Sequence, residues 1–218
     1  MANEIKIYTY QQRTPEWYQV RQGKITASDI NNILGKETLA TTKNAIDNLA
    51  QSLAIESIHG ILEDTFVSFD MQRGIDMEPS AYAKLEQYLG EQFIECHQIG
   101  FAELNEHIGA SPDALCGDNR VGEIKCPNPK NYFKYVIDGV INPKHYAQMQ
   151  HQMLCTGTDG AYYLNYCVHN AKEYITLRVV ERDNDMINLI QSRCEAVIEL
   201  KLKYIDLLTA TDDFNVIK

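Results

Sequence analysis

The stretch IGASPDALCGDNRVGEIKCPNP, residues 108–129, carries two acidic residues and a lysine where a turn leads into a strand. The Ser-Pro-Asp step is typical of a turn, and the apolar run that follows reads as a strand that Pro127 stops. Because side chains alternate across a strand, Glu123 and Lys125 are predicted to share one face, while Ile124 lies on the other.

Two interpretations of this stretch remain open from its residues alone. Asp113 and Glu123, helped by the backbone carbonyl of Ile124, could bind a hard divalent cation, with Lys125 holding a water molecule or the charge that develops on a phosphate. Alternatively, Asp113 caps a turn, and Glu123 and Lys125 form part of a salt-bridged, solvent-facing strand. The stretch by itself slightly favours the second interpretation.

A second cation would need another carboxylate, and Glu78 is the best candidate donor. It stands at a Met-Glu-Pro junction, apart from the other acidic residues of an otherwise amphipathic helix predicted over residues 73–90. Pro79 is expected in the early part of that helix or at a bend in it.

Helices dominate the first ninety residues. Thr14 suits an N-cap with Pro15 at the first helical position, and Gly23 is placed to end that helix. A second short helix, capped by Thr26 or Ser28 and ending at Gly35, would follow after a tight turn, which gives weak support to a helix-turn-helix DNA reader. A third helix is predicted over residues 42–62.

Strands are predicted on both sides of a later helix. An antiparallel pair is expected over residues 93–104 and 107–115, followed by the strand that carries Glu123. Next come a helix over residues 142–157, strands over 161–168 and 173–183, and a last helix from 183 or 184 to 208. This order predicts an α/β chain whose mixed or antiparallel sheet is centred on residues 92–125, with α+β character, folded as one domain over residues 1–218.

Composition excludes several classes of protein. The chain contains no apolar run of about 20 residues, and its first residues lack the layout of a signal peptide, so we expect a cytoplasmic protein without a membrane span. Its six cysteines show no zinc or iron–sulfur spacing and are expected to be reduced. No phosphate-binding glycine loop or Gly-x-Ser-x-Gly elbow supports ATP use or serine hydrolysis.

Four blocks of sequence together resemble a known group of enzymes. They are EWYQVRQGKITASDI, RGIDMEPSAYAKLE, IGASPDALCGDNRVGEIKCP and HYAQMQHQMLCTG, and they cover roughly a third of the chain. Their content and order resemble the PD-(D/E)xK nuclease superfamily, and within it the phage lambda exonuclease family, also described as YqaJ-like viral recombinases. The resemblance reverses the order of the two interpretations and favours a metal site.

The resemblance implies a role for each of nine residues. Asp113, Glu123 and the carbonyl of Ile124 would bind Mg²⁺, with Mn²⁺ as a possible substitute, and Glu78 would complete the surroundings of a second ion. Lys125 would assist the attacking water, beside the motif glutamine Gln148. The remaining three residues, which would grip the 5′-terminal phosphate, are Arg21, Ser28 and Ser111.

The resemblance also implies a fold, an activity and an assembly. The expected fold is a PD-(D/E)xK core with a central mixed sheet flanked by helices, in a ring of three subunits. The expected activity is 5′→3′ digestion of one strand of linear double-stranded DNA, which leaves 3′ single strands for a single-strand annealing protein. A net charge of −10 argues against a surface that is basic overall and binds DNA. DNA binding would instead need lysines gathered on one inner surface, and the candidates are Lys24, Lys130, Lys134 and Lys144.

Two rival functions remain. One is a related endonuclease or single-strand nuclease with the same core. The other, from a different class, is a DNA-binding or assembly module without turnover, against which the intact Asp113, Glu123 and Lys125 set argues. No block covers the last helix or an apolar wedge between residues 36 and 73, so the trimer follows from the resemblance alone.

Overall fold

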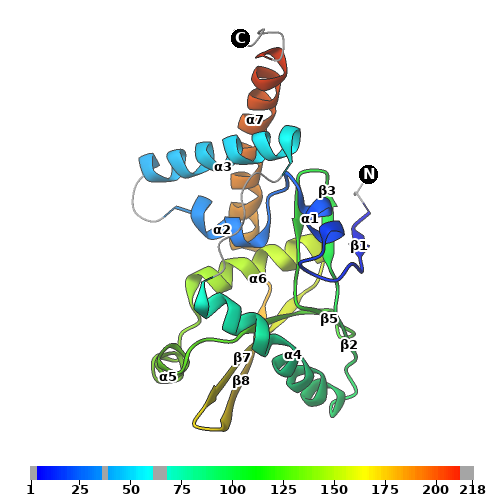
Figure 1. The fold of residues 1–218 in the computed structure, drawn as a ribbon, viewed down its shortest axis with the longest axis vertical. Helices are drawn as coiled ribbons and strands as arrows, with labels where there is room; N and C mark the ends of the chain where they lie inside the picture. Colours follow the sequence, from blue (N-terminus) through cyan, green and yellow to red (C-terminus); the bar gives the residue numbers. More distant parts are fainter. Residues whose placement is uncertain (1–3, 36–38, 61–67, 212–218) are drawn as a thin grey trace.

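The computed structural model describes residues 4–35, 39–60 and 68–211, in two sheets surrounded by helices (Figure 1). The helices in these ranges are α1 (Pro15–Arg21), α2 (Ala27–Ile33), α3 (Leu39–His59), α4 (Phe69–Gly90), α5 (Pro129–Asp138), α6 (Pro143–Thr156) and α7 (Asn184–Thr211). The strands are β1 (Lys6–Tyr8), β2 (Cys96–His97), β3 (Phe101–Asn105), β4 (Ile108–Ala110), β5 (Ala114–Cys116), β6 (Arg120–Lys125), β7 (Gly160–His169) and β8 (Lys172–Glu181).

The larger sheet has five strands in the order β2-β5-β6-β7-β8. Only β6 and β7 pair in parallel, and the other neighbours are antiparallel, so the sheet is mixed as predicted. Parallel strands need a long crossover connection, and here the crossover carries α5 and α6. The predicted strand over residues 120–126 is therefore a central strand, between β5 and β7.

A second sheet of three strands, β1-β3-β4, corrects the expectation of a single sheet centred on residues 92–125. The chain leaves this small sheet after Ala110 and returns to the large one, which already contains β2, at Ala114. Pro112 has no N–H to continue a ladder, whereas the N–H of Asp113 donates to the carbonyl of Gly122 at 3.0 Å and so begins the pairing with β6. Asp113 thus lies at the junction of the two sheets.

The two N-terminal helices begin and end as predicted. The side chain of Thr14 accepts from the N–H of Trp17 at 3.4 Å, and Pro15 occupies the first turn of α1. The chain then passes through Gly23, whose φ of +68° suits glycine. The N–H of Thr26 donates to the carboxylate of Asp29 at 2.8 Å, which is one half of a capping box for α2.

Helix α4 starts earlier than predicted. Ser68 is its N-cap, and its hydroxyl accepts from the N–H of Met71 at 3.2 Å. The prediction began at Arg73, so Pro79 lies further into the helix than expected, in its interior. Glu78 is therefore held on a regular helix and not at a helix end.

Helices cover both faces of the large sheet. Buried residues of α4, Leu85 and Leu89, pack with Ile124 and Leu164 on one face. On the other face lies α6, where Met149 and other residues contact the sheet. The opposite side of α6 faces α2 and α7, and α3 packs on α7, which projects beyond the rest of the chain (Figure 1). Because α6 is enclosed on both sides, even its polar residues Gln150, His151 and Gln152 are buried.

Some elements differ from the prediction. Helix α5 and strand β1 were not predicted, while the predicted end of α3 at Leu62 lies outside the described residues. All six cysteines are free. No helix within the described ranges combines the length and the apolar character that a bilayer crossing requires.

Candidate active site

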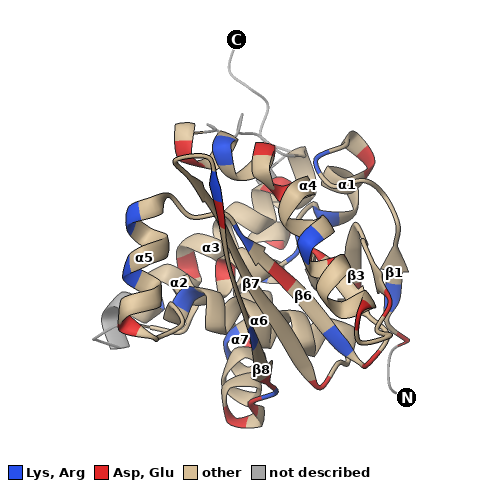
Figure 2. Cartoon of the chain, turned by 90° about the horizontal axis from the view of Figure 1, so that it is seen from below, with Lys and Arg blue, Asp and Glu red and all other residues tan. Residues whose placement is uncertain are grey.

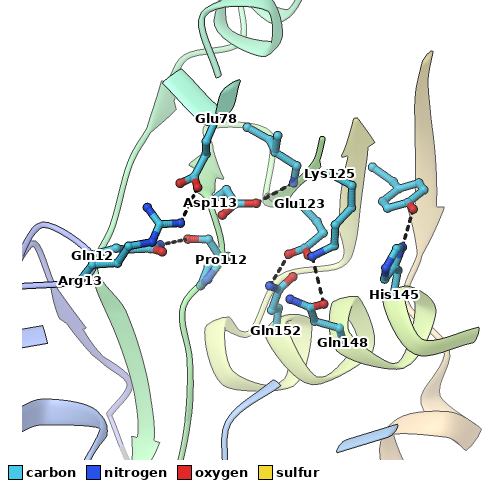
Figure 3. Close-up of polar contacts among 12 residues, drawn as sticks. Gln12, Arg13, Glu78, Pro112, Asp113, Glu123, Lys125, His145, Gln148 and Gln152 are labelled. Atoms are coloured by element: carbon cyan, nitrogen blue, oxygen red, sulfur yellow. Dashed lines mark hydrogen bonds and ion pairs between the residues drawn. The ribbon is translucent and has the colours of Figure 1, made fainter. Parts of the chain in front are cut away.

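Glu123 is buried in the centre of the protein, with 1% of its surface exposed. It lies on the face of β6 that α6 covers, and its Oε2 accepts a hydrogen bond from Nε2 of Gln152 at 2.6 Å (Figure 3). Ile124 points the other way, into the cluster beneath α4. The alternation predicted for β6 is confirmed, and the solvent-facing strand is excluded, because a buried carboxylate is costly unless partners stabilise it.

Asp113 reaches the same place from the junction between the sheets. Its Oδ2 accepts from the backbone N–H of Ile124 at 2.6 Å, which fixes the carboxylate beside the end of β6. Burial raises the pKa of Asp113 well above its ordinary value, and repulsion by Glu123 adds to the shift. Two carboxylates that repel each other in a buried position favour a bound cation.

Lys125 is the positive group closest to this pair. Its Nζ forms an ion pair with Oε1 of Glu123 and donates to Oε1 of Gln148 at 3.2 Å. Burial lowers the pKa of Lys125, but attraction to Glu123 and Asp113 outweighs this effect, so the pKa is raised overall. In the metal-free protein Lys125 is therefore an ammonium ion that partly neutralises the two acids.

Glu78 approaches from α4, on the other side of Asp113 (Figure 3). Its Oε2 lies 2.5 Å from Nη2 of Arg13, in an ion pair whose side chains are 23% and 41% exposed. Within the described ranges, no three Asp, Glu, His or Cys side chains stand ready as a metal-binding group. Asp113 and Glu123 converge, whereas the carboxylate of Glu78 is paired with Arg13.

Arg21 and Ser111 lie together at the other end of the site. Nη1 of Arg21 donates to Oγ of Ser111 at 2.9 Å, and the guanidinium carbon lies 4.1 Å from the ring centroid of Trp17. The indole N–H of Trp17 donates to the same Ser111 oxygen at 3.0 Å and to the carbonyl of Gly100 at 2.9 Å. This network holds the planar guanidinium in one orientation, as anion recognition requires.

A cavity of about 240 Å³ joins both ends of the site. All nine residues singled out from the sequence line it: Arg21, Ser28, Glu78, Ser111, Asp113, Glu123, Ile124, Lys125 and Gln148. They come from positions up to 127 residues apart, on four helices, on strand β6 and in the segment between the two sheets. The structure therefore brings the whole predicted set together.

Sequence reasoning missed several residues at the site. Gln12, Arg13 and Thr26 also line the cavity, and Gln152 binds Glu123. Gln152 lies one helical turn after Gln148, so helical spacing was a usable signal for it. No comparable pattern pointed to Arg13.

Among the predicted channel lysines, two have acidic partners. Lys24 lies 3.6 Å from Glu103, and Lys134 pairs with Asp138 on the same helix. Acidic and basic residues are interspersed over the elements visible in Figure 2, including β6 itself. An inner positive surface built from Lys24, Lys130, Lys134 and Lys144 remains a prediction.

The two histidines of α6 do not join the site. Nδ1 of His145 lies 2.6 Å from the hydroxyl of Tyr163, and Nε2 of His151 lies 3.1 Å from the carbonyl of Gly109. Burial lowers the pKa of each histidine to about 4, so both are neutral at pH 7. The two imidazoles therefore have separate partners and do not form a shared metal site.

The donor set suits a hard divalent cation. Two carboxylates converge, and Oε1 of Glu123 has the Lys125 ammonium as its partner but no well-aligned hydrogen bond. Carboxylate and carbonyl oxygens are the ligands that Mg²⁺ prefers. The arrangement combines acids for a metal with an arginine and a serine for a phosphate.

The chain resembles a described sequence family and solved exonuclease structures. The family model described as "YqaJ-like viral recombinase domain" matches residues 16–159. The alkaline exonuclease LHK-Exo from Laribacter hongkongensis is 29% identical with a TM-score of 0.73, over 91% of this chain and 98% of that one. Its complex with dAMP has the same identity and coverage and a TM-score of 0.74.

A more distant structure shares the fold. A phage-related exonuclease from Haemophilus somnus 129PT is 16% identical, with a TM-score of 0.55 over 89% of this chain and 99% of that one. At this identity the likeness concerns the fold alone. No curated protein sequence matches the chain.

Proposed function

The chain belongs to the YqaJ-like viral recombinase family, and we propose that it is a magnesium-dependent exonuclease. It is a nuclease of the lambda exonuclease type, with a PD-(D/E)xK-like mixed sheet flanked by helices. The proposed substrate is linear double-stranded DNA, of which one strand is degraded from its 5′ end. The product is a 3′ single-stranded tail for recombination by annealing.

One observation carries this proposal. Asp113, Glu123 and Lys125 line the same cavity as Arg21 and Ser111, and that cavity is only about 240 Å³. The groups that could hold a terminal phosphate therefore open onto the same space as the acids and Lys125. If Arg21 holds a terminal phosphate while the acids lie at the next one, cleavage releases one nucleotide from the end.

The acids would hold the metal ions. Asp113, Glu123 and the carbonyl of Ile124 would bind one Mg²⁺, and Glu78 would contribute to a second. Paired divalent ions in such nucleases activate water and stabilise the leaving oxygen. Mn²⁺ has similar ligand preferences and is expected to substitute.

Lys125 and Gln148 would position the reacting groups. The Lys125 ammonium stands beside Glu123, where it can hold a water molecule or the negative charge that grows on a phosphate oxygen. Gln148 accepts from Lys125 and so limits the positions of its side chain. Gln152 fixes Glu123 in the same way, from one turn further along α6.

Arg21, Ser111 and Ser28 would recognise the 5′-phosphate. The guanidinium already has its plane fixed by Trp17 and Ser111, so it can offer its remaining N–H groups to two phosphate oxygens. Burial lowers the pKa of Arg21, but a guanidinium remains protonated at neutral pH. The hydroxyl of Ser28 lies 3.0 Å from that of Thr26, at the start of α2.

The proposed assembly is a ring of three subunits in the cytoplasm of the host cell, working with a single-strand annealing protein. Family membership supports this assembly. Duplex DNA would enter the ring and the undigested strand would leave through it. Light scattering on the purified protein tests the subunit count, and a monomer at working concentrations would contradict it.

End-labelled DNA tests the activity directly. Linear duplex carrying a 5′ or a 3′ label is incubated with Mg²⁺ or with chelator, beside the Lys125→Ala variant. We expect early release of the 5′ label as mononucleotide, and no release with chelator or with the variant. Nicking of closed circles would favour an endonuclease. Equal, negligible digestion by both proteins would favour a DNA-binding module without turnover.

A further inference from the structure

The ion pair between Arg13 and Glu78 has no part in the function proposed above. Nη2 of Arg13 lies 2.5 Å from Oε2 of Glu78, directly beside Asp113 (Figure 3). Arg13 stands in the loop before α1 and Glu78 in the middle of α4, so the contact joins segments 65 residues apart. It is the contact that directs the carboxylate of Glu78.

The loop holds Arg13 in an unfavourable backbone conformation. Its φ is +69°, in the left-handed region that a residue with a Cβ adopts at a cost. The preceding residue, Gln12, anchors the loop: its side-chain amide donates to the carbonyls of Ile99 at 3.4 Å and Pro112 at 3.3 Å. The loop therefore holds the backbone of Arg13 beside the site, and its side chain is paired with Glu78.

Arg13 and Glu78 lie where two cavities meet. Both residues line the site cavity of about 240 Å³ and a neighbouring one of about 420 Å³, and Asp113 also lines both. The guanidinium thus lies beside the carboxylate of Glu78, at the edge of a cavity that Asp113 also lines, where positive charge is favoured. A divalent cation would be attracted to the same position for the same reason.

We propose that Arg13 stands in for a cation at Glu78 in the metal-free protein and competes with the second divalent ion for that carboxylate. The inference rests on the proposed function, because it assumes metal ions at Asp113, Glu123 and Glu78. This competition explains why Asp113 and Glu123 converge while the third acid, Glu78, is paired with an arginine. When the second ion binds, Glu78 exchanges its arginine partner for the metal.

The competition should be modest in size. Both side chains are partly exposed, at 41% and 23%, so solvent screens their attraction. The gain in second-site affinity without the arginine charge is up to about fivefold, as expected for a partly exposed ion pair. The metal affinity of the first site, at Asp113 and Glu123, should change by less than about twofold. This site lies further from the guanidinium, and the Lys125 ammonium partly neutralises its two carboxylates.

Three substitutions separate the charge of Arg13 from its backbone. Arg13→Gln removes the charge and keeps the backbone strain, Arg13→Gly removes both, and Arg13→Lys keeps both. If charge is decisive, the glutamine and glycine variants should behave alike in metal binding. The glycine variant alone should also unfold at a higher temperature, because glycine adopts a positive φ freely.

Calorimetric titration of Mn²⁺ into the full-length, metal-free protein tests the proposal. We expect two Mn²⁺ sites in the unmutated protein. The weaker site should bind Mn²⁺ up to about fivefold more tightly in Arg13→Gln and Arg13→Gly, and Arg13→Lys should bind Mn²⁺ almost as the unmutated protein does. The Mg²⁺ concentration for half-maximal digestion should fall in parallel.

Other outcomes would overturn the inference. Two Mn²⁺ sites with the weaker one unchanged or weakened in Arg13→Gln would overturn the competition alone and leave the nuclease proposal standing. If the weaker site bound Mn²⁺ more tightly in Arg13→Gly but not in Arg13→Gln, the backbone conformation of residue 13, and not its charge, would be the cause. Absence of Mn²⁺ binding in the unmutated protein would overturn the metal site and the inference together.

Discussion

Replacing Arg21 by lysine should impair digestion specifically at phosphorylated ends. Lysine keeps the charge but loses the planar fork and the stacking on Trp17, where the guanidinium carbon now lies 4.1 Å from the ring centroid. The lost stacking is worth about 0.5–1 kcal/mol, and one lost charge-assisted hydrogen bond about 1.5–2 kcal/mol. Together they amount to about 2–3 kcal/mol, or a fall in kcat/KM of roughly 30- to 150-fold.

The assay compares two duplexes of one sequence, one with a 5′-phosphate and one with a 5′-hydroxyl. The variant should lose most of its activity on the phosphorylated end and little on the hydroxyl end, where no phosphate is available to Arg21. Thermal unfolding checks that the variant is folded. An equal fall on both ends would refute phosphate recognition and would indicate that Arg21 only supports the packing of Ser111 and Trp17.

Three further predictions concern neighbouring residues. Asp113→Asn should raise the melting temperature in chelator at neutral pH. Because the pKa of Asp113 is raised in the folded protein, folding favours its protonated form, and stability falls as the pH rises from 3.8 towards the raised pKa. Added Mg²⁺ should reduce the difference in melting temperature between the variant and the unmutated protein. Gln152→Leu leaves Glu123 without its amide donor and should lower the unfolding free energy by about 1–3 kcal/mol in urea titrations. An unchanged unfolding midpoint would count against a stabilising hydrogen bond between Gln152 and Glu123. Ser111→Ala removes the hydroxyl that accepts from Arg21 and should cost about 1 kcal/mol of transition-state stabilisation, which is a roughly fivefold fall in kcat/KM on phosphorylated ends. Activity equal to that of the unmutated protein would exclude a role for the Ser111 hydroxyl.

Local patterns predicted local structure well. The alternation along β6 placed Glu123 and Lys125 on one face, because a strand has a period of two whatever surrounds it. Thr14 and Gly23 bounded α1 for equally local reasons, through a side-chain cap and a positive φ. The same signals flank the missed helix α5, which has an Asn128 cap and a left-handed Gly139, so its omission was avoidable.

Long-range features were beyond the reach of these patterns. The division of residues 92–125 between two sheets depends on which strands pair, and β1 joins β3 from almost a hundred residues away. The burial of Glu123 depends on α6, which enters the structure only after the crossover. Asp113, Glu123 and Lys125 were recognised by their resemblance to a family, whereas Arg13 was missed because nothing in its neighbourhood marks it as a partner of Glu78.

The proposed nuclease activity depends on divalent metal ions bound by Asp113 and Glu123 next to Lys125. The most direct measurement is anomalous X-ray scattering from crystals soaked in Mn²⁺, with crystals of the Asp113→Asn variant as the control. We predict an anomalous peak between the two carboxylates, at the roughly 2.0–2.2 Å expected for oxygen ligands of such an ion, and its loss or marked weakening in the variant. Mn²⁺ peaks only elsewhere on the protein would show that Asp113 and Glu123 are not the metal ligands.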